Sequence, residues 1–323
     1  MADDPQGSFG RMQLPQERFV EPTDLPTAPV PVVKPRRGSG ARIHEARPAQ
    51  RAPSRSDSAG EKRRYRARYA IVYDVAGPRV LLGVGWAILV AISLVYPPGR
   101  PGVPAALFAA AAAWAAYQTR MAWRAQRPEG NQWVAAAGAG ALPLAAAFLG
   151  SQGLGVALLA FVALALVAEL IDGGRTRATV AVAGHVVTCG VWVGLASASV
   201  VLTLRYEIGA VITLLVLVAV YEASDYIVGS GASNLIEGPL AGIISIAVVI
   251  AIVAFLRVPP FRGVDALAFG GLAAIGCPLG QLVGSALLPI PAAPAPALRR
   301  LDSLLVLAPV WAWQVGLLLT RTI

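Results

Sequence analysis

The chain has 323 residues, of which 56% are hydrophobic and only 14% are charged, and its net charge is +9. Soluble globular domains carry about 25% charged residues, so this composition excludes an ordinary soluble protein and favours one that is largely embedded in a membrane. The charge is also unevenly distributed, because the chain is polar and rich in Pro and Arg up to Arg79 and mostly apolar from Val80 onward.

Residues 1–78 are expected to form a disordered, basic, cytoplasmic tail. Their low content of apolar residues cannot offset the entropy lost on folding. The stretch KRRYRARY, from Lys62 to Tyr69, places a basic cluster just before the first apolar segment. Such a cluster favours contact with anionic lipid at the cytoplasmic face and does not indicate nucleic-acid binding. The N-terminus shows no apolar core of a cleavable signal peptide.

Residues 79–323 are expected to form an all-α, polytopic membrane domain. A helix needs roughly 20 apolar residues to cross the hydrocarbon core, and the sequence offers about nine such segments by this criterion. The second of them is rich in Ala and is the least hydrophobic. The predicted spans are 79–96, 103–119, 132–150, 153–171, 179–201, 207–227, 239–256, 264–288 and 303–320.

The distribution of Arg predicts which ends of these segments face the cytoplasm. Cytoplasmic loops carry an excess of Arg and Lys. With the tail inside, the inner loops hold more arginines than the outer ones, so the sequence predicts an integral membrane protein, in a bacterial inner membrane, with a cytoplasmic N-terminus. The inner arginines are Arg120, Arg124, Arg127, Arg175, Arg177, Arg299 and Arg300, and the outer ones are Arg100, Arg205, Arg257 and Arg262.

The eighth segment carries glycines at every fourth position, namely Gly276, Gly280 and Gly284. Small residues at this spacing let a neighbouring helix approach closely. They therefore predict tight helix packing, and a homodimer through this helix is one use of it. Pro278 predicts a kink within the same segment.

Several polar residues at the predicted inner face could carry chemistry. Glu169 and Asp172 are three residues apart, as are Glu222 and Asp225, so each pair shares a helix face. Clustered carboxylates could hold Mg²⁺, although polar residues also commonly end helices at the interface. Asn234 and Glu237 have the spacing of a helix capping box, and His185 is expected to hydrogen-bond between helices.

Three stretches in the C-terminal part of the chain share order and spacing with a known enzyme family. They are YEASDYIVGSGASNLIEGPLAGI from Tyr221, GCPLGQLVGSALL from Gly276 and LRRLDSLLVLAPVW from Leu298. The first has the Asp, aromatic, Gly and Glu-Gly pattern of the phosphatidate cytidylyltransferase (CDP-diacylglycerol synthase) family. The second is similar to its Gly-Asp-x-x-x-Ser-x-x-Lys-Arg step, and the third to its Asp-Arg-Leu-Asp-Ser-Leu segment. The chain therefore resembles this family over roughly residues 80–323.

The resemblance implies a transfer from CTP to phosphatidate, which gives CDP-diacylglycerol and pyrophosphate with the help of Mg²⁺. Phospholipid and CTP would be the ligands, with no nucleic acid involved. The residues that match the family motifs take roles accordingly. By resemblance, Asp225, Asp302 and Arg300 are the expected catalytic residues, Asp225 and Asp302 the metal ligands, and Glu237, Gly238, Ser285 and Arg299 the substrate-binding residues.

The sequence also departs from the family pattern. It has no Lys beyond Lys62, Leu288 and Pro289 stand where the family has Lys-Arg, and Arg299 stands at the first Asp of Asp-Arg-Leu-Asp. A linker of Pro and Ala replaces the family's His-Gly-Gly region. Three hypotheses thus remain open, namely a divergent cytidylyltransferase, a non-catalytic membrane protein that binds lipid or regulates a partner, and a transporter.

Overall fold

The computed structural model describes residues 76–95, 101–127, 129–173, 177–229, 236–290 and 293–321, and within these ranges the chain is helical with no strand. The predicted tail before residue 76, together with Arg175 and Asn234, lies outside the described residues, as does the side chain of Asp172.

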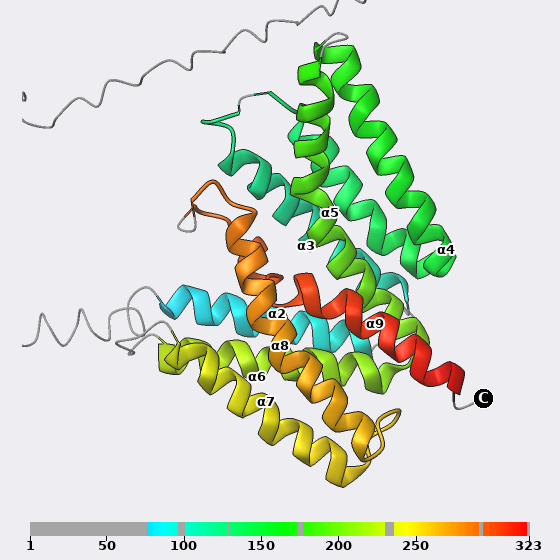
Figure 1. Cartoon of the computed structure of the whole chain (residues 1–323), viewed down its shortest axis with the longest axis vertical. Coiled ribbons are helices and arrows are strands. Elements are labelled where there is room, and N and C mark those ends of the chain that lie inside the picture. The colour runs from blue at the N-terminus through cyan, green and yellow to red at the C-terminus, as the bar shows by residue number, and fades with distance from the viewer. Residues whose placement is uncertain are drawn as a thin grey trace, which may run out of the picture. The chain divides into compact units, whose positions relative to one another are not determined.

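The helices lie where the apolar segments predict them (Figure 1). A short 3₁₀ helix, η2, precedes the last one. The elements in chain order are α2 (Ala76–Val95), α3 (Gly102–Ala122), α4 (Gln132–Gly173), α5 (Arg177–Tyr206), α6 (Ile208–Gly229), α7 (Glu237–Leu256), α8 (Val264–Ala286), η2 (Leu298–Arg300) and α9 (Leu304–Arg321).

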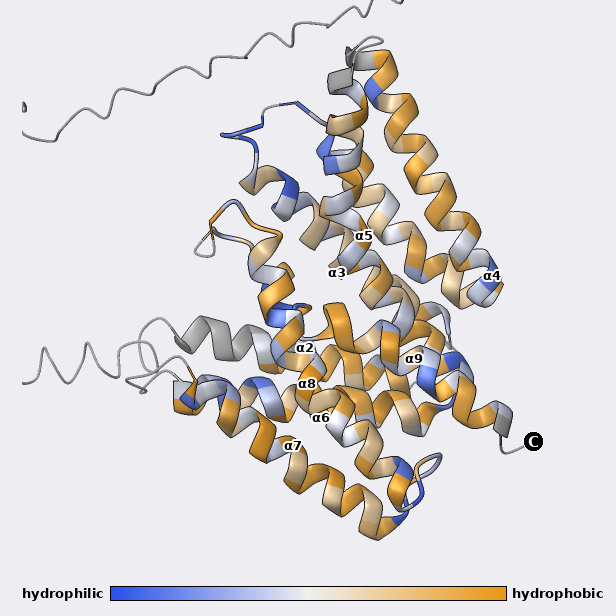
Figure 2. Ribbon diagram, viewed as in Figure 1, coloured by the Kyte–Doolittle hydropathy of each residue, from blue (hydrophilic) through white to orange (hydrophobic). Residues whose placement is uncertain are grey.

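Five of these helices, α4 to α8, are long and apolar enough to cross a membrane. Two shorter apolar stretches, Gly83–Val95 in α2 and Leu304–Thr320 in α9, accompany them. The apolar side chains of α4 and α7 point largely outward, and orange runs along both helices in Figure 2. An outward apolar surface of this kind is expected where lipid, not water, surrounds the helices. The described part of the chain is therefore an all-helical membrane domain.

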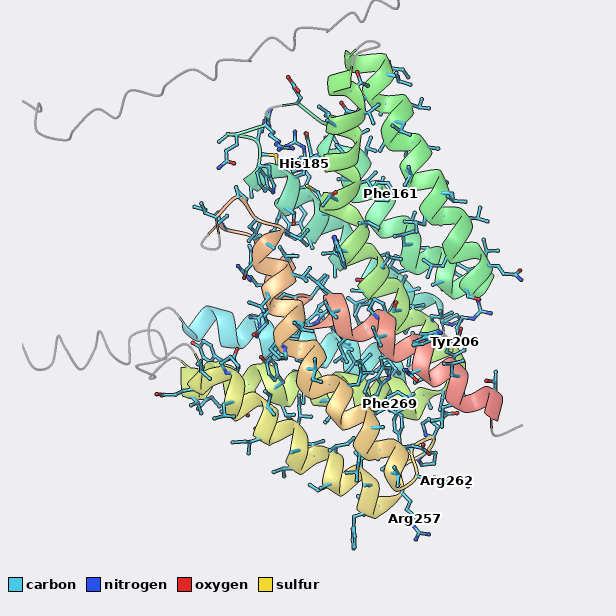
Figure 3. All side chains as sticks on the ribbon, in the orientation of Figure 1. Phe161, His185, Tyr206, Arg257, Arg262 and Phe269 are labelled. Atoms are coloured by element: carbon cyan, nitrogen blue, oxygen red, sulfur yellow. The ribbon has the colours of Figure 1, made fainter. Side chains whose placement is uncertain are left out.

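Helix α4 is a hairpin of two arms, which explains how one continuous element covers two predicted segments. Gly150 interrupts the helical backbone with φ 72° and ψ −156°, a conformation that glycine adopts without steric cost. The arms pack antiparallel, since Phe161 of the second arm lies against Gly138 of the first (Figure 3). At the far end the Asn131 N–H donates to Glu169 Oε1 over 3.0 Å.

Helix α5 is the most enclosed of the five candidate spans. It packs against both α3 and α4, and against α9. Gly190 and Gly194 allow this approach, because a side chain there would meet Phe161, Leu142 and the backbone of α4. The core of the domain is thus formed around α5, with Ala and Leu as its commonest buried residues.

Polar contacts at the helix ends divide into two groups. One group joins the α3–α4 loop to the end of α8, because Trp123 Nε1 donates to Leu287 O over 2.8 Å. The other joins the end of α5 to the α4 turn, because Arg205 Nη1 donates to Ala146 O at 3.1 Å and Ala147 O at 2.9 Å. These are the groups of loops that the Arg distribution assigns to opposite faces.

Candidate functional site

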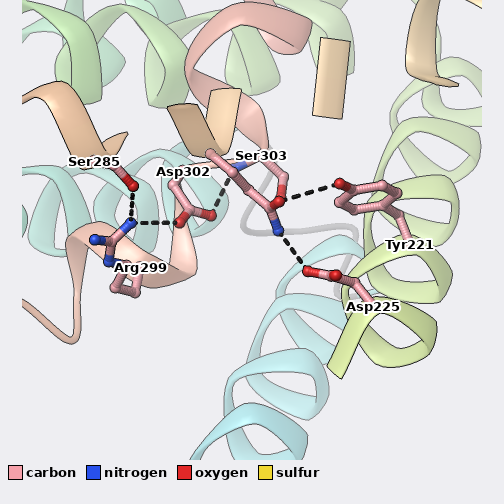
Figure 4. A network of polar contacts seen from close by, with 7 residues as sticks. Tyr221, Asp225, Ser285, Arg299, Asp302 and Ser303 are labelled. Atoms are coloured by element: carbon pink, nitrogen blue, oxygen red, sulfur yellow. Dashed lines mark hydrogen bonds and ion pairs between the residues drawn. The ribbon is translucent and has the colours of Figure 1, made fainter. Parts of the chain in front are cut away.

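A hydrogen-bonded chain links α6 to α8 at the centre of the candidate site. Gln281 Nε2 donates to Asp225 Oδ2 over 3.0 Å, and the Tyr221 hydroxyl donates to Gln281 Oε1 over 3.1 Å (Figure 4). Tyr221 and Asp225 are four residues apart and so share one face of α6. The amide of Gln281 therefore satisfies a phenol and a carboxylate at once.

A second group surrounds Asp302 between η2 and α9. Arg299 Nη1 lies 3.5 Å from Asp302 Oδ2 and donates to Ser285 Oγ over 3.0 Å. The other carboxylate oxygen, Asp302 Oδ1, accepts the Ser303 backbone N–H at 2.8 Å. Figure 4 shows this group beside Tyr221 and Asp225, and Ser285, like Gln281, belongs to α8. Asp302 is only 5% exposed, and the pairing with Arg299 offsets part of the cost of burying its charge.

The glycine ladder of α8 brings the two groups together. A Cβ at Gly280 would collide with the Asp302 carbonyl oxygen, and one at Gly284 would lie 2.7 Å from Asp302 Cβ. A Cβ at Gly276 would lie 3.0 Å from Leu307 Cβ. The close approach that the ladder predicts is therefore made to the chain's own α9 segment, which occupies the face that a dimer through these glycines would need.

The Glu237–Gly238 pair joins the site at the start of α7. Asp225 Oδ1 occupies the space that a Cβ at Gly238 would take. The Glu-Gly pattern in the sequence thus has a physical reason at its second position, because any larger residue would displace the Asp225 carboxylate. Glu237 lies in the first turn of α7.

The linker of Pro and Ala is anchored to the packed core at Ala295 and at the leucines that follow it. Ala295, Leu298 and Leu301 are almost completely buried, and Gln118 Oε1 of α3 accepts the Ala297 N–H at 2.9 Å. Arg300 packs on α2, where a Cβ at Gly83 would lie 2.8 Å from its Nη1, and it also interacts electrostatically with Glu222. The expected catalytic Arg300 therefore contacts α2.

Two further carboxylates influence Asp302. Glu222 of α6 and Asp225 lie close enough to interact with it electrostatically. Burial raises the pKa of Asp302 to about 6, even though Arg299 and the Ser303 N–H oppose the shift. Glu222 Oε1 is buried without a hydrogen-bond partner. The site therefore gathers three acidic side chains, one of which, Asp302, is almost completely shielded from water.

The expected metal centre does not fit these residues. No group of three or more His, Cys, Asp and Glu side chains in the described ranges could hold a metal ion. Asp225 and Asp302, the two expected ligands, have oxygens that already accept hydrogen bonds from Gln281, Arg299 and Ser303. Mg²⁺ would have to displace these donors from the oxygens that it needs.

The structure brings most of the predicted site residues together, namely Asp225, Gly238, Ser285, Arg299 and Asp302. Sequence reasoning missed Gln281, although a signal was present. In the Gly-Asp-x-x-x-Ser pattern to which Gly280–Ser285 is similar, Gln281 stands at the position of the Asp. An amide there replaces a carboxylate and bonds the neighbouring carboxylate directly.

A cavity of about 330 Å³ lies elsewhere, lined by Pro101, Ala147, Leu204 and Arg205, and it includes none of the predicted site residues.

Comparison of the chain with protein-family models, with curated proteins and with solved structures finds no match.

Proposed function

We propose that this chain is a non-catalytic membrane protein, similar in architecture to the CDP-diacylglycerol synthases, that binds a phospholipid at the cytoplasmic face and does not transfer a cytidylyl group. One observation carries the proposal. Gln281 stands at the position of a motif carboxylate and donates a hydrogen bond to Asp225 Oδ2, so a neutral amide takes the place of a metal ligand.

The charges of the described site support the same conclusion. CTP and phosphatidate together would bring about six negative charges to one place, and such reactions depend on metal ions and cationic side chains to offset them. Here Asp225 and Asp302 already act on each other as like charges. Arg299 is engaged with Asp302 and Ser285, and Arg300 packs against α2. The site is thus better suited to holding helices together than to gathering phosphates.

The proposed setting is a bacterial inner membrane, crossed about nine times, with the basic N-terminal tail in the cytoplasm. The two arms of α4 support separate crossings, because Gly150 turns the chain back on itself. The two groups of polar contacts at the helix ends also support alternation, since each joins loops that the Arg distribution assigns to one face.

The transferase remains the second candidate, favoured by the meeting of the three motif stretches. Asp225 and Gly238 of the first stretch lie together, and Gly280 and Ser285 of the second contact Asp302 and Arg299 of the third. In this alternative the phosphate of phosphatidate would attack the α-phosphorus of CTP and release pyrophosphate, with Mg²⁺ supplied together with the nucleotide.

The test is a measurement of pyrophosphate release by the purified full chain, given CTP, Mg²⁺ and phosphatidate. We expect none, together with retention of anionic lipid in native mass spectrometry of the same preparation. A Gln281→Glu variant is the matched control. It should unfold at a lower temperature in EDTA, because two carboxylates then face each other, and Mg²⁺ should restore its midpoint but leave that of the wild type unchanged. Pyrophosphate release by the wild-type chain would establish the transferase instead.

A further inference from the structure

An arginine outside the polar cluster is buried without full pairing. Arg120, in the last turn of α3, is 2% exposed. Its Nη2 donates to Arg127 O over 2.9 Å, while Nε and Nη1 have no hydrogen-bond partner. A guanidinium cannot lose its proton in a protein, and burying an unpaired charge is costly. The unpartnered donors therefore call for an acceptor that comes from outside the chain.

The surroundings of Arg120 are cationic on balance. Arg124 and Arg127 follow on the same turn and loop. The opposing carboxylates are Glu129, exposed on the loop, and Glu169, whose Oε1 accepts the Asn131 N–H at 3.0 Å. Glu169 interacts with Arg120 electrostatically but forms no hydrogen bond with its Nε or Nη1. Its negative charge therefore stabilises the guanidinium only partly.

Gly130 lets the α3–α4 loop pack directly against this guanidinium. A Cβ at Gly130 would lie 3.0 Å from both Nε and Nη2 of Arg120. On the other side Arg127 lies over the ring of Trp123 at 5.7 Å, and Trp123 contacts His185 edge to face with ring centroids 5.1 Å apart. Arg127 is thus held beside the same loop, where a second guanidinium could reach a ligand of Arg120.

Aromatic side chains place Arg120 at the depth of lipid headgroups. Trp114, Tyr117 and Trp133 form a row along α3 and the start of α4, with successive ring centroids 5.5 Å and 5.1 Å apart. Trp114 and Trp133 are 56% and 64% exposed. Exposed Trp and Tyr in a membrane protein gather at the headgroup level, and Arg120 lies less than one helical turn beyond Tyr117.

We propose that Arg120 forms a binding site for a phosphate group, with Arg127 as a second contact. Guanidinium is the side chain that best matches phosphate oxygens, because its N–H groups form charge-assisted hydrogen bonds in a fixed geometry. The ligand is a phosphate monoester of a lipid headgroup or free phosphate, which share this chemistry. The site deepens the lipid-binding function proposed above, and its existence as a lipid site rests on that function.

The test compares ligands on the full chain in detergent by isothermal titration calorimetry. Short-chain phosphatidic acid should bind at least tenfold more tightly than phosphatidylcholine of the same chain length. Inorganic phosphate that binds as tightly as phosphatidic acid would support the site and assign it to free phosphate. If neither phosphatidic acid nor inorganic phosphate binds more tightly than phosphatidylcholine, the proposal is wrong.

Variants locate the binding. Arg120→Met should weaken phosphatidic acid binding at least tenfold, without lowering the thermal midpoint of the unliganded chain, because it removes a buried unpaired charge. Arg120→Lys keeps the positive charge but loses the planar set of guanidinium N–H donors, and it should bind phosphatidic acid several-fold more weakly. Arg205→Met is the control, since Arg205 is paired with two carbonyls, and it should lower the midpoint and leave the affinity unchanged. Unchanged affinity in both Arg120 variants would overturn the proposal.

One comparison separates this site from the proposed function. If Arg299→Gln abolishes phosphatidic acid binding while the Arg120 variants bind normally, the lipid phosphate lies at the polar cluster and only the Arg120 site is wrong. If the wild-type chain releases pyrophosphate from CTP, the non-catalytic function is wrong, and the Arg120 affinities still decide the site.

Discussion

Asp302 is a residue of the site whose protonation changes within a pH range that a stability measurement can reach. It is almost completely buried, its carboxylate contacts Arg299 and the Ser303 N–H, and Glu222 and Asp225 lie nearby. The acidic neighbours and the loss of water oppose ionisation, whereas the arginine favours it. Because burial outweighs the arginine, the pKa of Asp302 rises from 3.8 to about 6.

A raised carboxyl pKa predicts a loss of stability as the pH rises. Between pH 4 and pH 6, in round numbers, folded Asp302 holds a proton that the unfolded chain has released, so the free energy of unfolding falls by about 1.4 kcal/mol for each pH unit at most. Above about pH 6 it should no longer change with this group. The measurement is the thermal midpoint of wild type and of Asp302→Asn in detergent at a series of pH values across this range. The midpoint should fall more steeply with rising pH in the wild type than in Asp302→Asn.

The matched control for this measurement is Asp265→Asn, which removes an exposed carboxylate from the first turn of α8. It should keep the wild-type slope. Parallel curves for wild type and Asp302→Asn would show that Asp302 titrates at its ordinary pKa in the folded protein.

The resemblance named Ser285, Arg299 and Asp302 as site residues, and in the structure these three contact one another. It could not predict that Gln281 bonds Asp225 or that Arg300 packs on α2. Those contacts depend on how α2, α6 and α8 cross, and the crossing is set by side-chain packing between segments far apart in the sequence. Arg120 was assigned only to a loop-facing position by its charge, and its burial depends on three elements at once.

At the scale of the elements, α8 owes its position to glycines that face η2 and α9. The Asp302 carbonyl oxygen and the Ser303 backbone lie directly against Gly280. Backbone atoms cannot move aside as the end of a flexible side chain can, so an added methyl group must push α8 away from the site.

Gly280→Ala should therefore destabilise the protein by about 1–3 kcal/mol, the range for overpacking. It should also loosen the Asp302–Arg299 pair, so that water reaches the Asp302 carboxylate. Gly271→Ala is the control within the same helix, because nothing lies within 4 Å of its added Cβ, and alanine's better helix propensity should leave the stability equal or higher. The measurement is the thermal midpoint of each variant relative to the wild type. Equal destabilisation by both substitutions would mean that α8 tolerates no methyl group for reasons unrelated to Asp302.

Helix α4 shows what periodicity and hydropathy predict well and what they miss. Two apolar segments were predicted at 132–150 and 153–171, and the two arms of the hairpin correspond to them. The sequence could not show that the connection at Gly150 is a sharp turn within one helical element, because a single glycine gives no signal of its φ angle. Arg205 contributes to this turn by bonding the Ala146 and Ala147 carbonyls that the kink leaves free.

The contacts among loops have a consequence for the whole membrane domain. The α3–α4 loop meets the end of α8 through Trp123 and Leu287, whereas Gly209 at the start of α6 packs against the Pro259 carbonyl of the α7–α8 loop. Helices that cross a bilayer in alternation must place successive loops on opposite faces. In the topology proposed above, the α3–α4 loop, which is rich in arginine, faces the cytoplasm and the α7–α8 loop faces outward.

This arrangement predicts where single cysteines can be labelled in intact cells. Glu129 of the α3–α4 loop and Arg262 of the α7–α8 loop are both exposed, and the native Cys189 and Cys277 are buried. Arg262→Cys should react with a membrane-impermeant maleimide added outside the inner membrane, whereas Glu129→Cys should react only after the membrane is permeabilised. Labelling of both from outside would contradict alternation. Labelling of Glu129→Cys alone would invert the orientation and place Arg120, with its proposed phosphate, in the outer leaflet.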